Sequence, residues 1–114
     1  MHEAGIAMSI IETAAAHLEK SGYGKVDSVS VRIGAASGVV PECLRFAFNA
    51  ARAGTPLENA ELLIEEVPVK GLCPACGKSF ITEEKYFLSC PGCGQPVVRM
   101  VAGRELDIME IEVS

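Results

Sequence analysis

The stretch CPACGKSFITEEKYFLSCPGCG, at residues 73–94, carries one short motif, CPxCG, at each of its ends. It contains four of the chain's five cysteines: Cys73, Cys76, Cys90 and Cys93. Two residues between the cysteines of a pair let both sulfurs face one ion, and the glycine after each pair suits the turn that follows. The repeat predicts a tetrahedral four-thiolate site of the structural kind, with no coordination position open to water or substrate.

Zinc is the ion that this spacing favours. Iron in the same four-sulfur cage stays open as an alternative, because ligand softness and geometry do not separate the two metals. A pair of redox dithiols is the other alternative, although a matched repeat argues against it. Residues 70–100 hold few aliphatic side chains, so we expect their folding to be coupled to metal binding and this part to melt first when the metal is removed.

Helical patterns appear twice before the cysteine segment. Apolar residues recur at steps of three and four between Glu3 and Lys20, and Ser21–Gly22 supplies a helix stop. Pro41 suits the first turn of a second helix, which is expected to run to Gly54 with an apolar face made by Leu44, Phe48 and Ala51. Cys43 on this helix is predicted to be a small buried hydrophobic residue.

Three strands are predicted around these helices. KVDSVSVRIG (25–34) alternates apolar and polar residues, which indicates one buried face. ELLIEEVPV (61–69) and LDIMEIEVS (106–114) are the other two. The alternation of the last strand slips between Ile108 and Met109, and either a bulge or burial on both faces would explain the slip.

Strand-like sequence resumes after the cysteine segment, which indicates an insertion that leaves the main domain and returns to it. We therefore predict an α+β protein with two helices packed on a three-stranded sheet. Residues 1–69 and 101–114 form the main domain, and residues 70–100 form an inserted zinc-ribbon-like domain of two CPxCG knuckles.

Composition limits the function classes. A chain of 114 residues is long enough for one compact domain and a small second unit. Its net charge of −5 argues against electrostatic binding to nucleic acid or anionic lipid. No apolar run approaches the ~20 residues needed to cross a bilayer, and Glu3 stands where a secretory signal would carry a base. The odd number of cysteines, four of them in two close pairs, also fits a reducing compartment better than a disulfide framework. We therefore expect a cytoplasmic protein.

The first residues, MHEAGIAMSI, offer a second metal site. The amine of Met1, the deprotonated backbone nitrogen of His2 and its ring nitrogen can close adjacent chelate rings, and such in-plane donors favour square-planar nickel or copper(II) over zinc. Met1 is expected to be retained because histidine is not small. Glu3 either adds a carboxylate or favours the positive end of the helix, and His17 suits a helix C-terminus. The plain alternative is an exposed histidine before a helix-start glutamate.

Four stretches in this order resemble the HypA family of hydrogenase nickel-incorporation proteins. They are the MHE start, VRIGAASGVVPECLRFAF (31–48), the two CPxCG knuckles and GRELDIMEIEV (103–113), and they span nearly the whole chain. The resemblance implies a nickel metallochaperone that acts with a partner GTPase to load the large subunit of [NiFe]-hydrogenase, and in some organisms urease. It places nickel on Met1, His2 and Glu3, and structural zinc on the four cysteines of the knuckles.

The same residues fit two other functional classes less well. A nucleic-acid-binding or protein-interaction zinc ribbon is the main alternative, but residues 70–100 carry a formal charge of only +2, which four thiolates and one Zn²⁺ cancel. A metal-dependent hydrolase needs an open coordination position that a four-thiolate site lacks, so no enzyme activity is expected. A homodimer formed by exchange of the insertion is compatible with its attachment at two strand ends.

Overall fold

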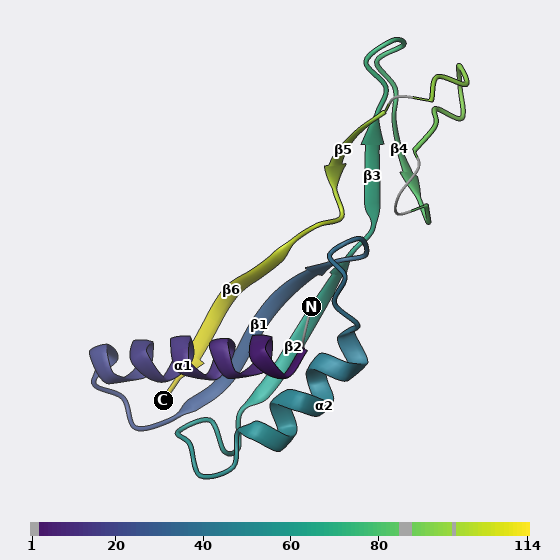
Figure 1. The fold of residues 1–114 in the computed structure, drawn as a ribbon. Helices are drawn as coiled ribbons and strands as arrows, with labels where there is room; N and C mark the ends of the chain where they lie inside the picture. Colours follow the sequence, from purple (N-terminus) through teal and green to yellow (C-terminus); the bar gives the residue numbers. More distant parts are fainter. Residues whose placement is uncertain (1–2, 85–87, 97) are drawn as a thin grey trace.

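The computed structural model describes residues 3–84, 88–96 and 98–114. The elements follow in the order α1 (Glu3–Ser21), β1 (Val26–Gly34), α2 (Pro41–Ala51), β2 (Glu61–Val67), β3 (Val69–Leu72), β4 (Ser79–Thr82), β5 (Arg99–Ala102) and β6 (Leu106–Val113). They form two three-stranded sheets, ordered β2-β1-β6 and β4-β3-β5, at opposite ends of the molecule (Figure 1). The radius of gyration of 17.5 Å exceeds the ~13 Å expected of a compact chain of this length, in keeping with two units joined end to end.

The two helices cover one face of the larger sheet, with α1 beside β1 and β6 and α2 beside β2 (Figure 1). Helix α1 buries one stripe at helical spacing, made by Ala7, Ile10, Ile11, Ala14 and Leu18. It ends as the sequence predicts, because the Ser21 hydroxyl donates to the Leu18 carbonyl at 2.7 Å and Gly22 takes a left-handed φ of 79°. No helix in the described part of the chain is long and apolar enough to cross a membrane.

Helix α2 begins with Pro41 in its first turn, as predicted, and buries Leu44 and Phe48. The prediction for Cys43 is wrong, because its side chain is exposed. Leu44 and Phe48 lie four residues apart on the face toward the sheet, whereas Cys43 precedes Leu44 by about 100° of helix rotation and points to solvent.

The larger sheet has the three predicted strands. Strand β1 lies in the centre, paired parallel with β2 and antiparallel with β6. Val29, Val31 and Ile33 are buried, while Ser30 and Arg32 on the other face are only half-buried. The slip in β6 is a bulge: Ser30 pairs with Glu110 and Val31 with Ile108, so Met109 has no partner on β1.

Two arginines of the α2 region reach the chain at and just before β2. The guanidinium of Arg45 donates to the carbonyl of Leu62 at 2.8 Å, and that of Arg52 donates to the carbonyl of Ala60. These bonds occupy acceptors that an edge strand would otherwise present to another chain. The outer edge of β2 is therefore partly closed by the protein's own side chains.

The smaller sheet holds the cysteine segment, and the sequence did not reveal its strands. Strand β3 pairs antiparallel with both β4 and β5. Gly71 in β3 allows the close packing there, because a Cβ at this position would lie 2.6 Å from the ring of Phe80. The packing of Phe80 against Gly71 therefore adds an apolar contact to a sheet with short strands.

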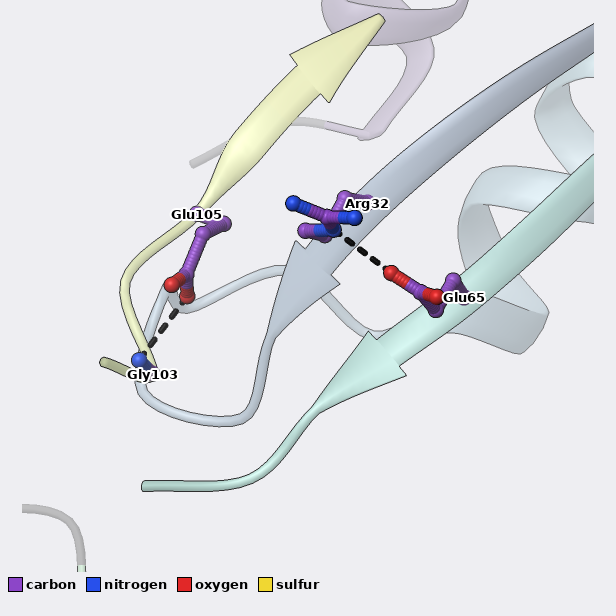
Figure 2. A network of polar contacts seen from close by, with 4 residues as sticks. All are labelled: Arg32, Glu65, Gly103 and Glu105. Carbon is purple, nitrogen blue, oxygen red and sulfur yellow. Dashed lines mark hydrogen bonds and ion pairs between the residues drawn. The ribbon is translucent and has the colours of Figure 1, made fainter. Parts of the chain in front are cut away.

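The two units meet at a contact between glycines. A Cβ on Gly34 would lie 2.2 Å from the backbone of Gly103, which itself has a φ of 124°. The loop after β1 also bonds to both connections: the N–H of Ala35 donates to Val67 at 2.8 Å, and that of Ala36 donates to Gly103 at 2.6 Å. The Glu105 carboxylate accepts the N–H of Gly103 at 2.8 Å (Figure 2). Residues 34–36 therefore contact both connections between the larger and the smaller sheet, at Val67 and at Gly103.

Candidate metal centres

The two CPxCG motifs fold into matching knuckles at the far end of the smaller unit (Figure 1). In the first, the N–H of Gly77 donates to the carbonyl of Cys73 at 2.8 Å, and in the second the N–H of Gly94 donates to Cys90 at 2.9 Å. Both glycines have a φ of 76°, the left-handed value expected from the sequence. The repeat in sequence is therefore a repeat in structure.

The knuckles bring four sulfurs together. The Sγ atoms of Cys73, Cys76, Cys90 and Cys93 all lie within 4.8 Å of one another. Across the knuckles, Cys73 and Cys93 are 3.5 Å apart and Cys76 and Cys90 are 3.6 Å apart. Sulfurs at ~2.3 Å from one tetrahedral ion lie about 3.8 Å apart, so this donor set fits a four-thiolate zinc or iron site. None of the five cysteines is in a disulfide.

The environment favours ionised sulfur, but not on all four residues at once. The backbone N–H of Cys93 donates to Cys90 Sγ at 3.4 Å and, against burial, lowers the pKa of Cys90 to about 6. A backbone N–H, that of Cys76, also lowers the pKa of Cys73. Although the backbone at Gln95 lowers it, the pKa of Cys93 is raised to about 12 by the neighbouring thiols of Cys73 and Cys90. Four charged sulfurs at this distance need a cation among them.

The N-terminal metal residues are described only in part. Met1 and His2 lie outside the described residues, and Glu3 is the first residue of α1. The Glu3 carboxylate accepts the backbone N–H of Val40 at 3.1 Å. Val40 is the N-cap of α2 and has no capping bond from its own side chain, so Glu3 supplies a cap from a distant part of the chain.

The sequence alone did not predict this bond between Glu3 and Val40. A signal for it exists in hindsight, since a helix that opens Val-Pro lacks the hydroxyl or carboxylate that normally satisfies its first N–H groups. The bond ties the start of α1 to the loop that also holds the two connections of the smaller unit. His17 is exposed on α1, and in the described part of the chain it joins no group of metal-binding side chains.

Known proteins resemble the chain over its whole length. A family model described as "Hydrogenase/urease nickel incorporation, metallochaperone, hypA" matches residues 1–113. The hydrogenase maturation factor HypA of Chloroflexus aggregans is 44% identical over 112 residues, 98% of each chain. That of Geobacter metallireducens is 45% identical over 114 residues, 99% of each chain.

Solved structures agree with the fold. The solution structure of the nickel metallochaperone HypA from Helicobacter pylori aligns with a TM-score of 0.67 and 25% identity, over 99% of this chain and 97% of that one. A second solution structure, titled HypA protein, aligns with a TM-score of 0.73 and the same identity, over 100% and 97%. The arrangement of the helices and sheets is therefore one that solved HypA structures share.

Proposed function

Since this chain belongs to the HypA family of hydrogenase and urease nickel-incorporation metallochaperones, we propose that it carries Ni(II) at its own N-terminus and delivers it for assembly of the [NiFe]-hydrogenase active site. The observation that carries the proposal is the family match from residue 1 to residue 113, which includes the MHE start. A metallochaperone is a carrier and not an enzyme, so nickel here is cargo.

The proposed nickel donors are Met1 through its amine, His2 through its backbone and ring nitrogens, and Glu3. Nitrogen donors in one plane suit Ni(II) better than zinc. The backbone nitrogen must lose its proton before it binds, so affinity falls as pH falls and the cargo can be released. The bond from the Glu3 carboxylate to the backbone N–H of Val40 also anchors the first turn of α1 directly after Met1 and His2.

We propose that the four cysteines hold zinc as a permanent structural ion. Four thiolates saturate a tetrahedral ion, so this site offers no place for cargo or catalysis. The two metals then fall on the two predicted domains, with nickel on residues 1–69 and 101–114 and zinc on residues 70–100. Zinc closes a module whose sheet has strands of only four residues.

The proposed partners are a nickel-handling GTPase of the hydrogenase maturation system and the hydrogenase large subunit. Urease is a second proposed recipient, because the family description names both enzymes. The five cysteines outside any disulfide support the cytoplasm as the place of action. The net charge of −5 disfavours the alternative function, a nucleic-acid-binding zinc ribbon.

The test is a nickel titration by isothermal calorimetry on the zinc-loaded protein. Two changes remove donors: His2→Ala, and an extension of two residues that turns the Met1 amine into an amide. Each should weaken nickel binding by at least about tenfold. His17→Ala is the matched control and should bind as the native protein does. Undiminished binding by the extended chain would show that nickel sits elsewhere.

Glu3 needs its own pair of variants. Glu3→Gln keeps an oxygen that accepts from Val40, whereas Glu3→Ala removes it. If Glu3 acts by position, the glutamine variant binds nickel like the native chain and the alanine variant binds more weakly. Equal loss in both variants would instead assign the carboxylate to the metal.

A further inference from the structure

Strand β6 forms an open edge of the larger sheet. In the described residues it pairs only with β1, on one side. The other edge strand, β2, has Arg45 bonded to its backbone, but no side chain among residues 4–84, 88–96 and 98–114 does the same along β6. Side chains from Leu106 to Glu110 are all exposed. This edge therefore presents free backbone groups to a partner.

The helix-side face of β6 is apolar. Leu106 and Ile108 pair with the inward-facing Ile33 and Val31, yet they are 38% and 36% exposed because α1 does not cover them. Together with Ile6 and Ile10 of α1 and Val31 of β1 they line a groove of about 420 Å³. Its lining also includes Gly5, Ser9, Thr13 and Asp107. Apolar side chains from a strand added beside β6 would point into this groove.

The opposite face of the sheet is acidic. The strand register places five carboxylates there: Glu61, Glu65, Asp107, Glu110 and Glu112. Arg32 is the single basic residue at the strand positions of this face, and its guanidinium is already paired with Glu65 (Figure 2). Basic side chains from a strand added beside β6 would meet the acids nearest the edge, Asp107, Glu110 and Glu112.

The same charges disfavour a second copy as the occupant. Antiparallel pairing of β6 with another β6 would set Asp107, Glu110 and Glu112 of one chain against those of the other, and like charges across a ladder are destabilising. The bulge at Met109 further disturbs the flat edge that self-pairing needs. The carboxylates along β6 therefore favour a partner segment with basic side chains.

We propose that β6 is a docking edge for an extended segment of a partner protein in which apolar and basic residues alternate. The segment adds as a strand, with its apolar side chains in the groove beside α1 and its basic side chains against the acidic face. Gly5 and Ile6 line the groove, so the segment lies next to the start of α1. Docking here goes beyond the proposed nickel chemistry and does not depend on it.

The probe is a fluorescein-labelled, end-capped peptide of eight residues that alternates valine and lysine. Binding to the zinc-loaded protein is followed by fluorescence anisotropy, and its place by amide shifts in ¹⁵N-labelled protein. We expect shifts along β6 and binding that weakens with salt. A valine–glutamate peptide and a peptide with lysines and valines in blocks should bind far more weakly, because the first reverses the charge and the second breaks the alternation.

Protein variants locate the site. Glu110→Lys should weaken binding about fivefold, since it replaces an attraction by a repulsion at the edge. Glu58→Lys, which makes the same charge change at an exposed turn residue outside both sheets, should leave binding unchanged. A variant with N-terminal residues added should still bind the peptide, which separates this proposal from the nickel site.

Four results would overturn the proposal. One is equal binding of the valine–glutamate peptide, another is equal weakening by Glu58→Lys and Glu110→Lys, and a third is amide shifts confined to β2 or the knuckles. Shifts of β6 that depend on protein concentration without peptide would assign the edge to a second copy instead.

Discussion

The strongest test of the core compares two phenylalanines of one helix. Phe48 is 0% exposed, while Phe46, two residues earlier on α2, is 78% exposed. Replacing a buried phenylalanine by alanine removes its apolar contact and leaves a cavity, at a cost of about 4 kcal/mol. Phe46→Ala loses almost no buried surface, so its effect should stay within ~0.5 kcal/mol.

Urea unfolding followed by far-UV circular dichroism measures both variants. A loss of ~4 kcal/mol is a large part of the 5–15 kcal/mol typical of a domain, so the Phe48→Ala midpoint should fall steeply while the slope is unchanged. The knuckles lie in the other unit, and Phe48→Ala should therefore keep its zinc and its protected thiols. Equal destabilisation by the two variants, or loss of zinc in Phe48→Ala alone, would refute this account of the core and of the two units.

Three further outcomes follow from the structure. Ellman's reagent should label one thiol quickly in the zinc-loaded protein, Cys43, and all five after a strong chelator is added; fast labelling of several thiols in the loaded protein would contradict the four-thiolate site. Chelation should also collapse the amide signals of β3, β4 and β5 while those of α1 remain dispersed, and simultaneous loss of both sets would mean that the units fold as one. Gly34→Ala should lower the free energy of unfolding by ~3 kcal/mol or more, measured by thermal unfolding, because its Cβ would overlap the backbone of Gly103. Gly5→Ala is the control: its Cβ enters open space on α1, so it should raise the free energy of unfolding by up to ~1 kcal/mol. An unchanged stability of Gly34→Ala would disprove the tight junction.

Periodicity identified the elements whose faces differ most. The helix that starts at Glu3 and the three strands of the larger sheet were predicted from apolar spacing, and the bulge of β6 lies where that spacing slips. The knuckles were predicted because metal ligation by CxxC fixes the local backbone. Local patterns suffice where a local rule dictates the conformation.

Contacts between distant segments were not predictable in this way. The bond from Glu3 to Val40 and the contact of Gly34 with Gly103 join residues far apart in the sequence, and no local spacing encodes them. The four-residue strands of the smaller sheet are too short for a clear alternation. The predicted burial of Cys43 is wrong because residue type alone does not decide burial. The position of Cys43 relative to Leu44 and Phe48 places it on the outer face of α2.

The proposed function requires that the N-terminus hold nickel in nitrogen donors while the four cysteines keep a different ion. Nickel-edge X-ray absorption of the zinc-loaded native protein and of His2→Ala tests it most directly. We expect a near-planar, nitrogen-rich spectrum without sulfur in the native protein, and loss of that spectrum in the variant. A nickel–sulfur shell that His2→Ala leaves unchanged would contradict it.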